Sequence, residues 1–309
     1  MCFSNAPAGT ALPAKLVFCH AMDETRMNAH MQVPEEWRNW IAHNLERGCD
    51  LEMLVADMLR AGFDAGAARN AVFGMADQNV TAAAAANGTY VYETPRLPAG
   101  NVIHAQERDV RVVLRIDRPT IAFVDNLLDA DECDELVRMS AHKLVRSAIV
   151  DRARGSAEVT TGRTSEGTYF PLNADAFIAR LDRRIAALMN APIENGEGLQ
   201  ILHYRTGDEY APHYDYFPPE DAGSRAHIAQ GGQRVASLII YLNDVEDGGA
   251  TVFPKLGLRI GPKKGAAVYF EYCNSLDQVD PQTLHGGLPV LKGEKWIATK
   301  WVRQRRYVA

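Results

Sequence analysis

The sequence has few cysteines, and their arrangement does not indicate disulfide bonds. The five cysteines are an odd number, and no two are separated by only two residues; they lie at Cys2, Cys19, Cys49, Cys133 and Cys273. A chain of 309 residues can also bury a sizeable core without covalent cross-links. We therefore expect a reducing environment, and we predict that the protein is cytoplasmic.

Long apolar runs and an excess of positive charge are also missing. The apolar run at 16–19 is too short for the core of a signal peptide, and no stretch approaches the roughly 18–20 apolar residues of a membrane span. The formal net charge is −6, which argues against nucleic acids and anionic membranes as partners. Hydrophobic residues make up 47% of the chain, a share that is typical of a globular protein.

Changes in residue periodicity divide the chain into four parts. Residues 1–33 show no period and are predicted to be a flexible leader. Residues 34–76 contain three short stretches with apolar residues at helical spacing, which predict a small three-helix module. Residues 77–100 combine an alanine run with prolines and glycines and are predicted to be a linker. Residues 101–309 form the main domain.

The three-helix module is small enough that we expect it to dock on something. A docking or dimerisation element is the favoured interpretation, so a homodimer is one expected assembly. A protein-binding module is the alternative, because the helix count and lengths also resemble ubiquitin-associated bundles.

The main domain is predicted to combine helices with many short strands. Helical spacing marks two helices, one capped by Asp129 or Asp131 and one over about 174–189. Short strands separated by Gly, Pro, Asn and Asp are expected at 199–204, 235–242, 250–253, 266–270 and 296–302. This pattern indicates an α+β fold in which supporting helices accompany a double-stranded β-helix, or jelly roll.

Three residues of the main domain have the chemistry of a metal site. His213 and Asp215 are two residues apart, so on a strand both side chains face the same side, and His285 follows where a strand meets a glycine turn. Two imidazoles and one carboxylate on one face of a metal leave the other face open, as in non-haem Fe(II) oxygenases. A His-x-Asp pair alone is a weak signal, because many such pairs are surface polar residues.

Lys295 lies ten residues after His285, in a segment with the alternation of a strand. There it shares a face with Ile297, Thr299 and Trp301. Burying a lysine among apolar residues requires a partner of opposite charge, and a dicarboxylate co-substrate could supply it. The alternative is a surface lysine near a turn.

From Glu197 to Trp301 the sequence resembles the catalytic domain of prolyl 4-hydroxylases. The segments that carry the resemblance are 197–204, 207–215, 231–234, 241–245, 248–254, 275–277, 284–287 and 292–301. The segment 162–167 also matches, so the resemblance covers about 120–303.

The resemblance implies an activity and a set of residues. The activity is hydroxylation of a prolyl residue in a peptide or protein, with Fe(II), O2 and 2-oxoglutarate, which becomes succinate and CO2, and with ascorbate as reductant. His213, Asp215 and His285 would bind Fe(II) and, with Lys295, form the catalytic set. Lys295, Tyr204 and Thr251 would hold the far carboxylate of 2-oxoglutarate. The residues implied for the peptide groove or active site are Arg163, Ser165, Glu197, Tyr210, Arg234 and Trp301.

Two departures from the family pattern leave the substrate open. Ala250 stands where the family often has an acidic residue, and Gly287 stands where animal collagen enzymes often have cysteine. Hydroxylation of a free amino acid or another small molecule is therefore an alternative. A non-catalytic metal-binding sensor is a further one, as is a metal-binding jelly roll that uses no 2-oxoglutarate.

The segment 217–233 is long and poor in strand-forming residues. We interpret it as a mobile lid over the peptide groove. His227 within it is expected to be solvated, and Arg234 just after it could form a salt bridge at the start of a strand.

Overall fold

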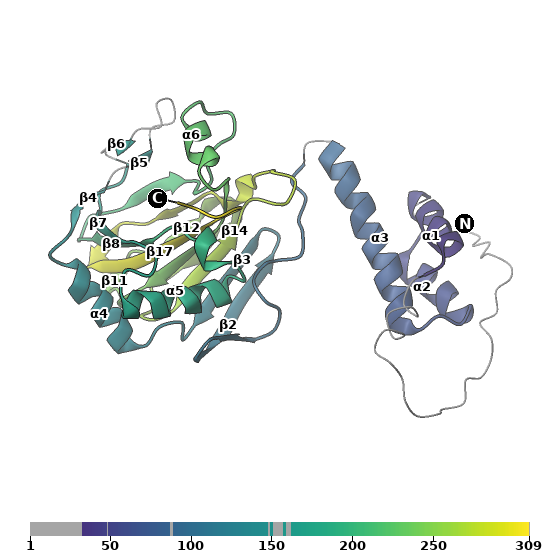
Figure 1. Cartoon of the computed structure of the whole chain (residues 1–309), viewed down its shortest axis with the longest axis horizontal. Helices are drawn as coiled ribbons and strands as arrows, with labels where there is room; N and C mark the ends of the chain where they lie inside the picture. The colour runs from purple at the N-terminus through teal and green to yellow at the C-terminus, as the bar shows by residue number, and fades with distance from the viewer. Residues whose placement is uncertain are drawn as a thin grey trace. The chain divides into compact units, whose positions relative to one another are not determined.

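The computed structural model describes residues 33–47, 49–86, 89–147, 149–150, 157–158 and 162–308. Residues 1–32 of the predicted leader therefore lie outside the described part of the chain. The chain divides into two compact units, residues 1–91 and residues 92–309. Figure 1 shows a helical first unit and a second unit built on sheets. Within the described ranges, no helix is both long and apolar enough to cross a membrane.

The first unit contains α1 (Glu35–Glu46), α2 (Leu51–Arg60) and α3 (Ala65–Ala86), which share one apolar core. Asp50 caps α2, because its side chain accepts a hydrogen bond from the Met53 amide. The linker predicted from residue 77 is wrong at its start, since α3 continues to Ala86. Alanine has the highest helix propensity, so the run at 82–86 extends the helix instead of ending it.

The second unit is built on a nine-stranded sheet with the order β1-β2-β3-β14-β10-β17-β8-β7-β4. All neighbouring strands in it are antiparallel. Its strands are β1 (Val102–Ala105), β2 (Arg108–Asp117), β3 (Thr120–Asp125), β14 (Ala267–Glu271), β10 (Arg234–Tyr241), β17 (Lys295–Arg303), β8 (Leu199–Tyr204), β7 (Glu166–Phe170) and β4 (Val145–Arg146). The central strands β10 and β17 are buried along almost their whole length. β10 is mostly apolar, whereas β17 also buries the charged side chains of Lys295, Lys300 and Arg303.

A four-stranded antiparallel sheet has the order β13-β12-β15-β9. Its strands are β13 (Leu258–Ile260), β12 (Thr251–Phe253), β15 (His285–Gly287) and β9 (Tyr210–His213). Two further ribbons pair β11 (Asp247–Gly248) with β16 (Val290–Lys292), and β5 (Ile149–Val150) with β6 (Ala157–Glu158). The strands predicted at 199–204, 235–242, 250–253, 266–270 and 296–302 are all present, with ends shifted by one residue at most.

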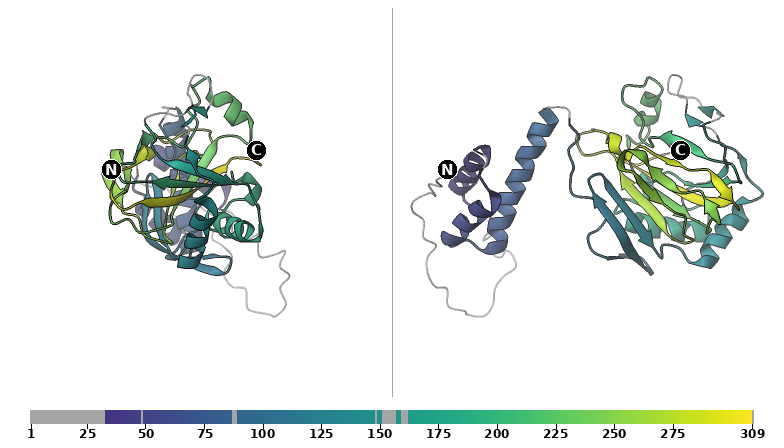
Figure 2. Two further views of the ribbon diagram at one scale, coloured as in Figure 1. Left: turned by 90° about the vertical axis from the view of Figure 1, so that its left-hand side faces the viewer. Right: turned by 180° about the vertical axis from the view of Figure 1, so that it is seen from behind.

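Helices cover one side of the large sheet. Figures 1 and 2 show α4 (Ala130–Ser140) and α5 (Ala176–Leu188) on the same side of it. Both were predicted from helical spacing, and α4 begins with a capping box at Asp129. The short helix α6 (Ser224–Ala229) was not predicted. The described residues of the unit also form the 3-10 turns η2 (Ile193–Asn195), η3 (Pro254–Leu256) and η4 (Pro281–Thr283).

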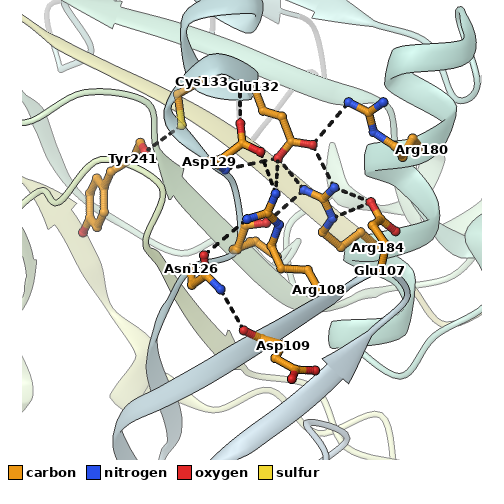
Figure 3. A network of polar contacts seen from close by, with 11 residues as sticks. Glu107, Arg108, Asp109, Asn126, Asp129, Glu132, Cys133, Arg180, Arg184 and Tyr241 are labelled. Atoms are coloured by element: carbon orange, nitrogen blue, oxygen red, sulfur yellow. Dashed lines mark hydrogen bonds and ion pairs between the residues drawn. The ribbon is translucent and has the colours of Figure 1, made fainter.

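A network of charged side chains ties α4 and α5 to the β1–β2 hairpin (Figure 3). Arg184 on α5 is buried and donates to both carboxylate oxygens of Glu132 on α4, at 2.6 and 2.8 Å. It also donates to Glu107, which lies between β1 and β2, with Nε–Oε1 at 3.1 Å. Arg108 bridges from β2 to Asp129 at 2.6 Å. The network therefore joins three elements that are distant in sequence.

Candidate active site

The three predicted metal ligands come together where β9 meets β15. His213 and His285 lie directly opposite each other in this antiparallel pair. Asp215 is not on the strand as predicted, because β9 ends at His213 and the chain bends beyond it. The bend still turns the carboxylate toward both rings. Asp215 Oδ1 is 3.5 Å from His213 Nε2, and its Oδ2 is 3.5 Å from His285 Nε2.

Hydrogen bonds from the protein orient each of these side chains. His213 Nδ1–H donates to the Ala211 carbonyl and His285 Nδ1–H donates to the Thr283 carbonyl, both at 3.0 Å. Each Nε2 therefore keeps its lone pair on the side that faces Asp215. Ser237 Oγ on β10 donates to Asp215 Oδ2 at 2.5 Å and also contacts the Tyr272 hydroxyl at 2.9 Å.

The charges at this position suit a bound cation. Burial lowers the pKa of His285 to about 4, so its ring is neutral near pH 7. Burial acts to raise the pKa of Asp215, but the two imidazoles and Arg234 outweigh it and hold the pKa well below its usual range. One ionised carboxylate and neutral imidazoles are the ligand forms that a divalent metal requires. The three ligand atoms lie within 4.8 Å of one another, so the residues fit a single ion.

Lys295 lies at the start of β17 with its side chain buried. Burial lowers its pKa to about 8. The ammonium donates to the Gly249 carbonyl at 2.6 Å and faces the rings of Tyr204 and Tyr241, at 5.4 and 5.9 Å from their centroids. Among the residues that the structure describes, no carboxylate forms a salt bridge with it. The group is thus suited to an acidic ligand from outside the chain.

The metal-ligand trio and Lys295 line one cavity of about 520 Å³. The strand periodicity predicted for Lys295 is confirmed, because Ile297, Thr299 and Trp301 line the same cavity. Gly287 lies close by: a Cβ at this position would be 3.7 Å from Lys295 Nζ. Of the other residues proposed for the site, those that line the cavity are Arg163, Glu197, Tyr204, Tyr210, Arg234 and Thr251.

Ser165 is the one proposed site residue that does not line the cavity. It is fully buried behind the wall, where its hydroxyl donates to Ser147 Oγ at 3.1 Å and accepts from Arg163 Nε at 3.3 Å. Ser165 therefore does not face the cavity, and its contact with the site is the hydrogen bond that it accepts from Arg163. The guanidinium of Arg163 in turn lies over the Tyr210 ring, 4.8 Å from its centroid.

Glu197 and Arg234 are joined to each other across the cavity wall. Arg234 Nε and Nη2 donate to the two oxygens of Glu197 at 2.6 and 2.8 Å. The salt bridge considered for Arg234 at the start of its strand is therefore confirmed. Arg234 also stacks on Trp301, 4.0 Å from the ring centroid. These charges are neutralised within the protein and shape the wall.

Sequence patterns did not reveal several residues that support the site. Ser237 holds Asp215, Tyr241 donates to Thr251 Oγ1 at 2.8 Å, and Arg303 donates to Glu197 at 2.6 Å. Each lies on a strand whose alternation was recognised, but their partners are between 10 and 106 residues away in the chain. Only the strand order, which the sequence pattern does not supply, brings them together.

The sequence is similar to known proteins. Residues 199–303 match the 2OG-Fe(II) oxygenase superfamily. Prolyl 4-hydroxylase 5 of Arabidopsis thaliana is 39% identical over 202 residues, which cover 59% of this chain and 68% of that protein. Probable prolyl 4-hydroxylase 10 of the same plant is 38% identical over 208 residues, covering 61% and 70% of the two chains.

A similar solved structure is the viral collagen prolyl hydroxylase of Paramecium Bursaria Chlorella virus-1 in complex with 2OG. It is 30% identical with a TM-score of 0.48, and the match covers 59% of this chain and 95% of that chain. The matched family model identifies the class of this protein as the 2OG-Fe(II) oxygenases. Within it, the chain belongs to the prolyl 4-hydroxylase family.

Proposed function

We propose that this protein is an Fe(II)- and 2-oxoglutarate-dependent dioxygenase that hydroxylates a prolyl residue in a peptide or protein. The observation that carries the proposal is the convergence of His213, Asp215 and His285 with Lys295 in one cavity. The proposed fold of residues 101–309 is a double-stranded β-helix formed by the two large sheets, with residues 34–76 as an appended helical module.

The metal would be held by Nε2 of His213, Nε2 of His285 and the carboxylate of Asp215. Both Nδ1–H groups are already bonded to backbone carbonyls, so the rings are oriented before an ion arrives. The family relationship and the donor set both support Fe(II). Held by these residues together with 2-oxoglutarate, the ion would supply O2 activation: one oxygen atom would enter a C–H bond of the substrate and the other would enter succinate as CO2 is released.

The far carboxylate of 2-oxoglutarate would be held at the other end of the cavity. Lys295 supplies the positive charge. Thr251 accepts its hydrogen bond from Tyr241, so its own hydroxyl proton can be donated to the carboxylate. Tyr204 lies beside Lys295 on the neighbouring strand, in direct register with it. This residue set accounts for a buried lysine, which would otherwise be costly.

A peptide would contact the aromatic part of the wall. Tyr210 stacks on His213 with 3.7 Å between ring centroids, and the Arg163 guanidinium lies over the ring at 4.8 Å, so a proline packed against the edge of Tyr210 would lie next to the metal ligands. Trp301 lines the same cavity, where it stacks with Arg234. Aromatic side chains are the usual contact surface for extended proline-containing segments. The residues thereby orient the target carbon and limit the access of water.

The test is succinate formation by the purified protein with Fe(II), 2-oxoglutarate, ascorbate and O2, with and without a pool of proline-containing peptides. We expect peptide-stimulated succinate and a matching mass gain of about 16 daltons in one peptide, the mass of one oxygen atom. Asp215→Ala should bind iron weakly and form no succinate, since it lacks the one charged ligand. Full turnover with iron retained in that variant would refute the assignment.

Two further expectations accompany the assay. Omitting ascorbate tests the reductant proposed from the family resemblance. Fractionation of cells that express the protein tests the proposed cytoplasmic location.

A further inference from the structure

The segment 217–233 was predicted to be a mobile lid, yet its two ends are joined to each other in the structure. The side-chain amide of Gln233 pairs with the backbone of Phe217: Oε1 accepts from the Phe217 amide at 2.8 Å, and Nε2 donates to the Phe217 carbonyl at 2.6 Å. Gln233 is buried, with 5% of its surface exposed. The pair closes the segment at its base, in the way a pair of antiparallel strands would.

Arg303 holds the same segment from the other side. This residue ends β17, and its side chain is only 2% exposed. Nη1 donates to the His227 carbonyl at 3.0 Å and to the Gly232 carbonyl at 2.8 Å, while Nε donates to Glu197 Oε1 at 2.6 Å. One guanidinium thus connects α6, the end of the segment and the cavity wall.

Phe217 lies at the centre of these contacts. Its ring stacks on His227 at 4.9 Å with an interplanar angle of 5°. The guanidiniums of Arg234 and Arg303 each lie 4.8 Å from the ring centroid. His227 is therefore half-buried against the Phe217 ring, and it is not among the described residues that could hold the metal.

The clipped segment also forms part of the cavity. Phe217, Pro218, Asp221 and Ser224 all line it. The segment begins two residues after the proposed metal ligand Asp215, whose carbonyl accepts from Arg234 Nη1 at 3.2 Å. The position of the segment 217–233 is thus coupled to the cavity wall that a peptide would contact.

We propose that Gln233 and Arg303 form a clip that holds residues 217–232 as a preformed rim of the cavity, and that this clip sets the affinity for the peptide substrate. The inference rests on the proposed function for its substrate. A loop that is ordered before binding does not have to lose conformational freedom when the peptide arrives, so the clip lowers the cost of association. Gln233 and Arg303 are positioning residues, because they act through Phe217 and α6.

Hydrogen exchange tests the clip without any substrate. In the protein without peptide, we expect slow exchange at the Phe217 and Gly232 amides, which donate to Gln233 and Ile228. Arg303→Lys keeps the charge but cannot maintain the planar fork, so exchange at both amides should accelerate. Arg305→Lys is the matched control, because Arg305 is two residues away and exposed. Exchange that is already fast in the unaltered protein, or unchanged in Arg303→Lys, would overturn the proposal.

Kinetics test the consequence for substrate. Arg303→Lys should raise KM for the peptide by about tenfold, while kcat at saturating peptide and KM for 2-oxoglutarate stay within about twofold. Gln233→Glu replaces the donor to the Phe217 carbonyl with a negatively charged acceptor, which repels that carbonyl. This variant should show the same rise in the peptide KM, and it tests the proposal if Arg303→Lys does not fold. Equal losses for peptide and co-substrate would contradict a role in peptide affinity. Absence of peptide turnover in the unaltered protein would refute the proposed function, and the exchange data would still decide whether the clip exists.

Discussion

Lys295 shows how one residue links burial to co-substrate binding. Its ammonium is buried beside two aromatic rings and a carbonyl, without a carboxylate partner among the described residues. We expect Lys295→Met to weaken 2-oxoglutarate binding by about ten- to a hundredfold, since a charge-assisted contact contributes about 1.5–3 kcal/mol. Calorimetry on the Fe(II)-loaded protein under anaerobic conditions measures this. Unchanged affinity would remove Lys295 from the site.

The pH dependence of co-substrate binding follows from the same residue. Burial lowers the pKa of Lys295 from 10.5 to about 8 in the protein without ligand. Only the protonated form attracts a carboxylate, so a proton must be taken up on binding above pH 8. We therefore expect the Kd for 2-oxoglutarate to be constant below pH 8 and to rise by up to about tenfold per pH unit above it. In Lys295→Met this rise should vanish. A pH profile shared by both proteins would assign the dependence to another group.

At the scale of elements, the charged network in Figure 3 holds α4 and α5 together. Arg184→Met would leave the carboxylate of Glu132 buried without its main partner. We expect a loss of about 3–5 kcal/mol in the free energy of unfolding, measured by urea denaturation. Arg138→Met is the control, because Arg138 is 72% exposed in its pair with Glu135, and such pairs contribute at most about 1 kcal/mol. Similar small losses in both variants would show that the buried network does not contribute to the free energy of unfolding.

Sequence patterns predicted those elements that are long or strictly periodic. The strands β8, β10 and β17 follow from alternation and β-branched residues, and that alternation also placed Lys295 and Trp301 on one face. The patterns could not predict α6, which has only six residues between Gly223 and Gln230. Its position depends on Phe217 and Arg303, which are contacts made by the folded chain.

The errors within the site and the first unit have similar physical causes. Asp215 leaves the strand because β9 pairs with a strand of only three residues, so the ladder ends at His213. The alanine run at 82–86 was assigned to a linker by its neighbours in sequence, although its own helix propensity is high. The charged network joins residues 52 and 77 positions apart, a separation at which no local pattern operates.

At the scale of the whole molecule, the two units have separate cores. Among the residues that the structure describes, the apolar core of the helical unit and that of the second unit are made of different residues. The described residues that line the cavity lie between 162 and 301. The predicted linker 77–100 is also wrong at its end, because part of it belongs to the second unit. The amides of Arg96 and Leu97 donate to Glu271 at 2.7 and 3.3 Å, and the carboxylate of Glu93 accepts from the Ser275 amide at 3.1 Å.

This arrangement predicts that the residue at which a truncated protein begins decides its activity and its stability. A protein that begins at Tyr92 keeps the contacts of Glu93, Arg96 and Leu97, and we expect its kcat/KM for a short peptide to stay within about threefold of the full chain. A protein that begins at residue 101 loses them and leaves Glu271, whose pKa burial already raises, without its backbone donors. We expect a clearly lower Tm for this shorter protein, because a buried acceptor without a donor costs about 1–3 kcal/mol. Loss of turnover in the protein that begins at Tyr92, with its Tm preserved, would instead show that the helical unit takes part in binding the substrate.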